Sequence, residues 1–417
     1  MKKITDEHDV VVIGAGAAGI AAARRLVEAG VDVLLLEACN RVGGRALSVR
    51  QDDGGAIDLG CGWLHSADVN PWTDIAAALG FEIDRTRPPW QDDRHDLGMS
   101  LAQRRAFRTA STRFWEKFDT DSAPIPDQPA ADYLELGNPW NSLINATSTY
   151  INGAELAYVS ALDFARYADT HINWRVPAGY GTLIARYSAG LPIVLGCKVV
   201  RIDHSGAAVR IETGDGVLRA RTVIVTVSTN VLAAGAIRFT PDIPDARNAA
   251  AHLPLGHAEK VFLTLDNAAQ FPEDVRFFGA TDRAATGAYQ MRPFGRPMIE
   301  AYFGGSLARD LQTAGKAAMI AFAFEEIAAV LGAAIIARLR PLGVSSWADD
   351  PLILGSYSHA EPGRANARSV LSTPIQNRIF FAGEACSIND FSTAHGAYKT
   401  GVAAAEASFA QNKSTAK

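Results

Sequence analysis

The chain has 417 residues, of which 48% are hydrophobic and 20% are charged, a composition typical of a folded globular protein and too apolar for a disordered one. A chain of this length predicts two or three domains. Its 40 Lys and Arg against 45 Asp and Glu leave a net charge of −5, which provides no electrostatic footprint for nucleic acid or an anionic membrane. Its 36 glycines form no repeat or low-complexity tract, which indicates that they occupy special backbone positions.

Targeting and membrane signals are weak. Residues 1–9 are mostly charged or polar and lack the apolar region of a secretory signal. The most apolar stretch, residues 317–339, contains Glu325 and Glu326 and therefore predicts a partly buried helix rather than a membrane span. The four cysteines have neither the pattern of a disulfide framework nor that of a metal site. We expect a cytoplasmic protein with no metal site, no nucleic-acid partner and no membrane segment.

The first secondary-structure signals form a β-α-β unit. Residues 9–13 predict a strand, residues 17–29 a helix and residues 31–36 a second strand. Both strands are continuous apolar runs, which is typical of parallel strands covered on both faces.

The middle of the chain changes in character. Residues 87–129 are rich in Pro, Asp and Arg around a predicted helix at 101–118, which indicates a second domain. Strands are then predicted at 193–202, 209–213 and 219–227.

The last part of the chain predicts elements of both kinds. The expected elements are strands at 258–265 and 297–303, a helix or helix pair at 315–337, a strand at 378–382 and an Ala-rich helix at 395–409.

A glycine motif lies between the first strand and the first helix. Gly14, Gly16 and Gly19 form GxGxxG, in which glycines allow a tight turn, close approach of the backbone to a pyrophosphate and packing of helix on strand. The helix that begins at Ala17 directs its free amides at the phosphates. Glu37 ends the second strand, where its carboxylate can accept hydrogen bonds from ribose hydroxyls. Together these features predict dinucleotide binding.

The next segment distinguishes flavin from nicotinamide cofactors. Gly43 and Gly44 allow a second close backbone approach, and Arg45 can pair with the pyrophosphate. The pattern ExxxRxGGR, from Glu37 to Arg45, resembles the signature of the flavin-containing amine oxidase superfamily. Carotenoid desaturases and protoporphyrinogen oxidases share this signature, so it implies FAD rather than a particular substrate.

A second block supports the resemblance. Residues 381–384 (FAGE) and 392–397 (STAHGA) are similar to the closing FAD motif of amine oxidases. The resemblance implies that Glu384 holds the ribityl chain and that the helix start near Thr393 and Ala394 directs amides at the flavin pyrimidine ring. The positive end of a helix stabilises an anionic reduced flavin. Further FAD contacts are expected from Gly383 and Val199.

A third block, GCGWLH at residues 60–65, resembles the segment that passes the reactive face of the flavin in animal-type polyamine oxidases. It implies FAD contacts from Gly62, Trp63 and Leu64. L-amino-acid oxidases place a carboxylate-binding Arg where Trp63 stands, so an α-amino acid substrate is disfavoured. His65 matches the subfamily but is equally consistent with a hydrogen-bonded core histidine.

Two later segments match the same family. Lys260 corresponds to the lysine that reaches flavin N5 through a water, although a lysine in a strand can also be a solvated surface residue. Trp347 and the run LGSYS at residues 354–358 resemble the Trp and Gly-x-Tyr segment. The resemblance implies that Tyr357 forms one wall of an aromatic substrate cage.

Two departures from the monoamine oxidases narrow the subfamily. Ser356 stands where those enzymes have a flavin-linked cysteine, and Cys386 does not occupy that position, which implies noncovalent FAD. Thr393 replaces the second cage tyrosine, as in polyamine oxidases of the Ser-Thr-x-His-Gly-Ala type.

The resemblance therefore implies an FAD-dependent amine oxidase that uses O₂ and is closest to the polyamine oxidases. Hydride passes from the carbon α to the amine nitrogen to flavin N5, the imine hydrolyses to an aldehyde and an amine, and O₂ becomes H₂O₂. A polyamine or secondary amine is favoured, and an oxidase of smaller primary or alkaloid-type amines is the alternative. A flavoprotein desaturase or isomerase and a non-catalytic flavin-binding protein are more distant alternatives. The expected catalytic residues are Lys260, His65, Tyr357, Trp347 and Thr393, in a monomer or homodimer.

The expected fold class is α/β (α+β overall), with a Rossmann-type FAD-binding domain and a discontinuous substrate-binding domain of mixed sheet and helices. The FAD-binding domain is expected in three segments, 1–86, 176–254 and 347–417. The substrate domain is expected in the two inserts between them, 87–175 and 255–346.

Overall fold

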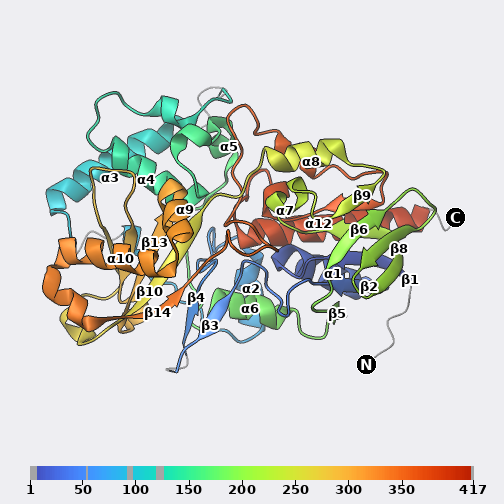
Figure 1. The fold of residues 1–417 in the computed structure, drawn as a ribbon, viewed down its shortest axis with the longest axis horizontal. Helices are drawn as coiled ribbons and strands as arrows, with labels where there is room; N and C mark the ends of the chain where they lie inside the picture. Colours follow the sequence, from blue (N-terminus) through green and yellow to red (C-terminus); the bar gives the residue numbers. More distant parts are fainter. Residues whose placement is uncertain (1–6, 53–54, 92–96, 119–125, 415–417) are drawn as a thin grey trace.

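The structure is a computed structural model that describes residues 7–52, 55–91, 97–118 and 126–414. Figure 1 shows two lobes side by side, with the first and last parts of the chain in one lobe and much of the middle of the chain in the other. Each lobe is built on its own sheet.

The larger sheet combines parallel and antiparallel pairs. Its order is β5 (Ile193–Val194), β2 (Val33–Leu36), β1 (Glu7–Ile13), β8 (Gly216–Val225), β7 (Val209–Thr213), β6 (Val199–Asp203) and β9 (Arg238–Thr240), with β15 (Ile379–Phe381) also beside β8. Strands β5, β2, β1, β8 and β15 run parallel. All four residues of β2 are buried, because helices cover both faces of this part of the sheet.

Helices pack on both faces of this sheet. On one face, α1 (Ala17–Glu28) lies against α12 (Ala394–Ser414), and the two share a core with β1 and β2. A side chain at Gly401 would place its Cβ 2.2 Å from the carbonyl oxygen of Ala18, so glycine permits this close helix contact. The other face is covered by α7 (Thr229–Ala233), α8 (Pro244–Ala251) and α11 (Ala367–Leu371). The predicted Rossmann-type arrangement is confirmed.

The second sheet is antiparallel throughout. Its order is β11 (Val275–Phe278), β12 (Ala288–Met291), β13 (Met298–Gly304), β10 (Ala258–Leu265) and β14 (Leu339–Val344). Alternate residues such as Val261, Ile299 and Phe303 pack against the helices α9 (Gly305–Ala314) and α10 (Lys316–Leu331). The intervening residues therefore face the opposite side, away from these helices.

The remaining elements connect and flank the two sheets. They are β3 (Ser48–Arg50), β4 (Ala56–Asp58), α2 (Pro71–Ala78), α3 (Leu101–Trp115), α4 (Asn141–Asn152), α5 (Ala161–Arg166) and α6 (Tyr180–Tyr187). Short 3₁₀ turns are η1 (Pro89–Gln91), η2 (Glu116–Phe118), η3 (Ala130–Tyr133), η4 (Leu156–Tyr158), η5 (Ala268–Gln270), η6 (Pro293–Gly295), η7 (Ala333–Arg338) and η8 (Glu384–Cys386). Of the helices that the structure describes, none has both the length and the hydropathy needed to cross a membrane.

Two predicted elements prove to be divided. The strand expected at 193–202 is split into β5 and β6, because Gly196 adopts a positive φ of 68° between them. The helix expected at 315–337 ends at Leu331, where Gly332 takes a φ of 88°. The turn η7 follows it.

A buried ion pair joins the helix α5 to α11. The Nε and Nη2 atoms of Arg368 each donate to a different oxygen of Asp163 at 2.7 Å, and both side chains are 1% exposed. Arg368 also donates through Nη1 to Ser358 Oγ at 3.0 Å. Such a bidentate pair satisfies two buried charges that would each be costly alone.

We expect Asp163→Asn to lower the free energy of unfolding by about 3–5 kcal/mol, because it leaves the guanidinium of Arg368 buried without a counter-charge. Urea unfolding of the purified protein measures this change. Asp310→Asn is the matched control, since Asp310 pairs with Arg309 on the surface, where such pairs contribute about 1 kcal/mol or less. Equal effects of the two variants would contradict a structural role for the buried pair.

A second buried carboxylate, Glu259 on β10, positions the segment that follows β14. Its oxygens accept hydrogen bonds from the hydroxyl of Ser345 and from the backbone N–H of Trp347, the latter at 2.6 Å. Glu259 is 1% exposed, and burial raises its pKa to about 7.

This raised pKa predicts a pH-dependent stability. Between its usual value of 4.5 and about 7, the folded state binds more protons than the unfolded state, so the free energy of unfolding falls as pH rises through this window. The shift corresponds to at most roughly 3 kcal/mol. We expect Glu259→Gln to reduce this loss in urea unfolding at pH 5 and pH 8, whereas Glu406→Gln on the exposed side of α12 keeps it. An unchanged slope in the first variant would contradict the assignment.

Candidate active site

A cavity of about 1400 Å³ extends between the two sheets. At the larger sheet it is lined by residues that follow parallel strands, including Gly14 after β1, Glu37 after β2 and Gly383 after β15. The carboxyl ends of parallel strands are the usual ligand-binding edge of an α/β sheet. Across the cavity lies the face of the second sheet that α9 and α10 leave uncovered.

The structure brings most of the predicted site residues together. The cavity is lined by Gly14, Gly16, Ala17, Glu37, Gly44, Arg45, Gly62, Trp63, His65, Val199, Lys260, Trp347, Tyr357, Gly383, Glu384, Thr393 and Ala394. Two others lie outside its lining. Leu64 is fully buried in the core between β1 and α1. Gly19 lies within α1, where an added Cβ would be 1.8 Å from the carbonyl oxygen of Gly14, so it serves the packing of helix on strand.

The turn after β1 requires glycine at residue 14. Gly14 has a φ of 102°, and an added Cβ would lie 2.6 Å from Thr226 Oγ1. Gly16 forms a bridge with Gly43 and has no atom within 4 Å of an added Cβ, so its open side faces the cavity. Gly44 has a φ of 58° and packs its backbone against Gly16. The two glycine segments thus form one cradle of exposed backbone.

Glu37 is fixed beside this cradle. One oxygen accepts from the backbone N–H of Ala15 at 2.6 Å and the other from that of Cys39 at 2.8 Å. Each oxygen has a second lone pair, and the carboxylate borders the cavity. The residue is therefore placed to accept hydrogen bonds from a bound ligand.

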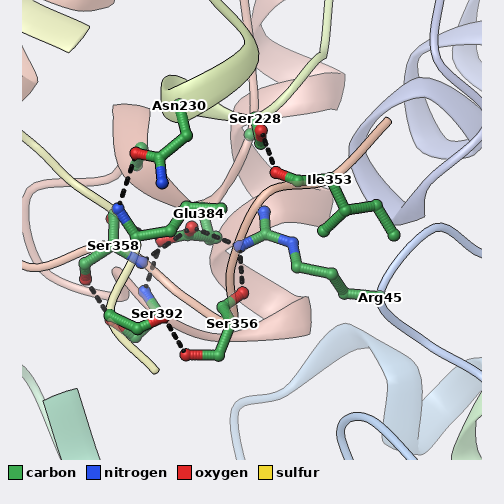
Figure 2. Close-up of polar contacts among 12 residues, drawn as sticks. Arg45, Ser228, Asn230, Ile353, Ser356, Ser358, Glu384 and Ser392 are labelled. Carbon is green, nitrogen blue, oxygen red and sulfur yellow. Dashed lines mark hydrogen bonds and ion pairs between the residues drawn. The ribbon is translucent and has the colours of Figure 1, made fainter. Parts of the chain in front are cut away.

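Figure 2 shows Arg45 directed at Glu384. The Nη1 of Arg45 donates to Glu384 at 2.9 Å and to the carbonyl of Ser356 at 2.6 Å. Glu384 also accepts hydrogen bonds from the backbone and hydroxyl of Ser358 and from the backbone of Ser392. Although burial disfavours the carboxylate, Arg45 and Arg368 hold its pKa below the usual range. Glu384 is thus ionised. A ribityl hydroxyl that donates to this carboxylate would share it with Arg45, Ser358 and Ser392.

Helix α12 starts at the cavity. Thr393 is the residue before its first turn, and its hydroxyl accepts from the backbone N–H of Gly396 at 2.9 Å, which is N-capping geometry. Ala394 also borders the cavity. The positive end of the helix therefore faces the site.

Lys260 on β10 is buried, with 8% of its surface exposed, so it is not the solvated surface lysine that the sequence also allowed. Its Nζ lies 2.9 Å from the carboxylate of Glu300 on β13 and donates to the carbonyl of Asp58 at 3.0 Å. An added Cβ at Gly62 would lie 3.5 Å from this Nζ. Burial alone disfavours the ammonium, but Glu300, Tyr302 and Asp58 raise the pKa of Lys260 above its ordinary value. The lysine is therefore charged.

Tyr357 belongs to a directed chain of hydroxyls. Its OH donates to the backbone carbonyl of Tyr150 at 2.5 Å and lies 2.7 Å from the OH of Tyr302. Because a hydroxyl has one proton, Tyr302 must donate to Tyr357. Burial raises the pKa of both phenols, so both are neutral.

His65 is held in one orientation. Its Nδ1 lies 2.6 Å from the side-chain oxygen of Asn173, an acceptor, so Nδ1 carries the proton and Nε2 is left as an acceptor. Burial lowers the pKa of His65, which keeps the ring neutral.

Two tryptophans complete the wall. Trp63 packs edge-on against Trp90 with ring centroids 4.4 Å apart, and the guanidinium of Arg175 lies 4.9 Å from its ring. Trp347 is buried and donates through Nε1 to the carbonyl of Leu59 at 3.0 Å. Ring packing therefore fixes the orientation of Trp63, and the hydrogen bond fixes that of Trp347.

Sequence reasoning missed several residues that line this cavity. They are Trp90, Tyr150, Asn173, Arg276, Gln290, Glu300 and Tyr302. Glu300 and Tyr302 alternate with buried apolar residues in β13, a period-2 signal that could have marked them. Their proximity to Lys260 follows only from strand pairing, in which Lys260 lies opposite Tyr302.

Comparison with known proteins agrees with this geometry. The sequence profile of the family described as "Flavin containing amine oxidoreductase" matches residues 17–173 and 159–407. Polyamine oxidase 3 of Oryza sativa subsp. japonica is 28% identical over 433 residues, covering 95% of this chain and 88% of that protein. Lysine-specific histone demethylase 1 homolog 2 of Arabidopsis thaliana is 25% identical, covering 95% of this chain and 58% of that protein.

A solved structure shows the same fold. Cyclohexylamine oxidase from Brevibacterium oxydans IH-35A superposes with a TM-score of 0.78 at 21% identity, covering 97% of this chain and 99% of that chain. With the glycine cradle, Glu37 and the lysine-bearing wall on one cavity, and a family profile matching most of its length, the chain belongs to the flavin-containing amine oxidoreductases.

Proposed function

We propose that this protein is an FAD-dependent amine oxidase. The observation that carries the proposal is the single cavity that joins the backbone cradle at Gly14 and Gly16 to the wall that holds Lys260 and Tyr357. Its volume of about 1400 Å³ exceeds the roughly 300–1,000 Å³ of ordinary small-molecule sites. It is therefore large enough for a dinucleotide and a substrate together.

FAD, when bound, supplies the acceptor for a hydride from the carbon α to the amine nitrogen. The amine loses this hydride and a proton to become an imine, and water then converts the imine to an aldehyde and an amine. O₂ takes the two electrons with two protons to give H₂O₂. The residues of this chain contribute positioning and the exclusion of water. Tyr357, Tyr302 and Trp63 present aromatic surface to the substrate, and the neutral His65 offers an acceptor.

We further infer that FAD is bound noncovalently. Ser356 replaces the cysteine that carries flavin in monoamine oxidases, and its hydroxyl donates to the carbonyl of Gly256 at 2.8 Å. Cys61 borders the cavity, but burial raises the pKa of its thiol to about 12, which suppresses the nucleophilic thiolate.

A polyamine or another secondary amine is the substrate that the sequence favours. The names of the polyamine oxidase relatives support this preference. Smaller primary or alkaloid-type amines are the alternative. The division into three FAD-binding and two substrate segments, the cytoplasmic location and the monomer or homodimer state stay predictions.

Anaerobic titration of the purified yellow protein with amines tests the proposal. We expect an amine to bleach the flavin absorbance and the bleached protein to release H₂O₂ in air. Flavin freed by acid and identified as FAD reports on its noncovalent attachment. The panel contains polyamines, alkyl amines and aromatic amines. If none of them bleaches the flavin, a non-catalytic flavoprotein, a desaturase or an isomerase is favoured.

Lys260 is expected to act in reoxidation. A fixed positive charge stabilises the negative charge that develops on dioxygen, so Lys260→Met should slow reoxidation about 100-fold and anaerobic reduction far less. Stopped-flow absorbance measures the two half-reactions separately. Lys316→Met, on the exposed end of α10, is the control and should change neither. Equal slowing of both half-reactions in Lys260→Met would rule out this role.

A further inference from the structure

Arg276 on β11 lines the cavity without a carboxylate partner. Among the residues that the structure describes, its guanidinium has ring contacts but no ion pair and no hydrogen bond. Its side chain is partly buried, and three aromatic rings surround it. The guanidinium carbon lies 5.0 Å from the ring of Phe278, 5.8 Å from that of Tyr150 and 5.9 Å from that of Trp90.

Two other cations that line this cavity are paired with carboxylates. Lys260 pairs with Glu300, and Arg45 pairs with Glu384. Burial lowers the pKa of Arg276, and within the described part of the chain Tyr150 and Tyr302 oppose this effect. Cation–π contacts stabilise a guanidinium by about 0.5–2 kcal/mol, which is less than the cost of burying an unpaired charge. A ligand that carries an anion would supply the missing counter-charge.

Strand register places Arg276 on the same wall as the lysine. Arg276 lies opposite Gln290, and Gln290 lies opposite Glu300. Lys260 is on the strand beyond, opposite Tyr302. With roughly 4.8 Å between neighbouring strands, the backbones of Arg276 and Lys260 are about 15 Å apart. The rings of Tyr150 and Tyr302, 6.1 Å apart, lie between the two cations.

We propose that Arg276 binds the carboxylate of the substrate, which is an amine with a carboxylate at the far end of its chain. This inference rests on the proposed amine oxidase function and departs from the polyamine preference stated there, because it assigns a carboxylate to the far end of the substrate. A guanidinium presents paired N–H donors that match the two oxygens of a carboxylate. The same charge repels the distal ammonium of a diamine or polyamine.

The distance between the two ends separates this class from α-amino acids. In an α-amino acid the carboxylate is bonded to the carbon that is oxidised. Arg276 lies three strands from Lys260, so its partner carboxylate is several carbons from the reacting carbon. ω-Amino carboxylates have this arrangement.

Binding of alkanoates to the FAD-loaded protein tests the anion site without turnover. Pentanoate and hexanoate are the probes, and perturbation of the flavin spectrum and isothermal titration give their Kd. We expect Arg276→Gln to weaken binding about 10- to 100-fold, the effect of losing a charge-assisted hydrogen bond. Arg276→Lys, which keeps the charge but not the paired donors, should fall between. Arg340→Gln, on the exposed part of β14, is the matched control. Unchanged Kd values in Arg276→Gln would overturn the proposal.

Turnover tests the substrate class. Wild-type kcat/KM should be higher for an ω-amino carboxylate than for the diamine of the same length, with a series of lengths compared. Arg276→Gln should lower kcat/KM for the amino carboxylate about 10- to 100-fold, raise it for the diamine and leave it little changed for a neutral alkyl amine. A uniform decrease for all three substrates, or a wild-type preference for the diamine, would overturn the proposal.

The two experiments fail in different ways. Alkanoate binding that depends on Arg276, with no amine reducing the flavin, would contradict amine oxidation while supporting the anion site. Flavin reduction by amines, with alkanoate binding unaffected by Arg276→Gln, would support amine oxidation and overturn the role of Arg276. Thermal unfolding of each variant identifies any loss of binding that comes from misfolding.

Discussion

A buried network of charges ties distant parts of the chain together at the cavity. Arg45 from the first part of the chain holds Glu384 from the last, and Ser358 links Glu384 to Arg368. Arg368 in turn holds Asp163 on α5. Each charge is costly to bury alone and acceptable only with its partners, so the network forms only when these segments have assembled. Arg45 and Glu384 of this network line the cavity. The cavity is therefore complete only when these segments have assembled.

The features that were readable from the sequence are local ones. Gly14, Gly16 and Glu37 lie within one β-α-β unit, and their spacing alone specifies a backbone cradle beside a carboxylate. Strand β10 was predicted with its observed bounds because its eight residues form one β-type run. The break between β5 and β6 depends on the backbone of Gly196, and a glycine at the end of an apolar run does not disclose its φ.

The opposite wall of the cavity could not be read in this way. Arg276, Gln290 and Glu300 are separated along the chain and meet only through antiparallel pairing of β11, β12 and β13, and two of these strands were not predicted. Their register determines which side chains share a face, and a one-residue shift of any one of these strands would move its residue to the other face. Lys260 shows the same limit, because its match to a family motif did not reveal that Glu300 is its partner.

The charged groups on this wall of the cavity differ in whether a partner neutralises them. Glu300 is the carboxylate that borders the sheet side of the cavity, and it is engaged by Lys260 at 2.9 Å, so the pair presents little net charge. Arg276 has no such partner within the described ranges and sits among aromatic rings, where low polarity strengthens its field. The whole chain carries a charge of −5, whereas Arg276 places a positive charge on this wall of the cavity. Because a cavity with apolar walls concentrates the field of a nearby uncompensated charge, the proposed role of Arg276 in substrate selection does not conflict with the overall negative charge.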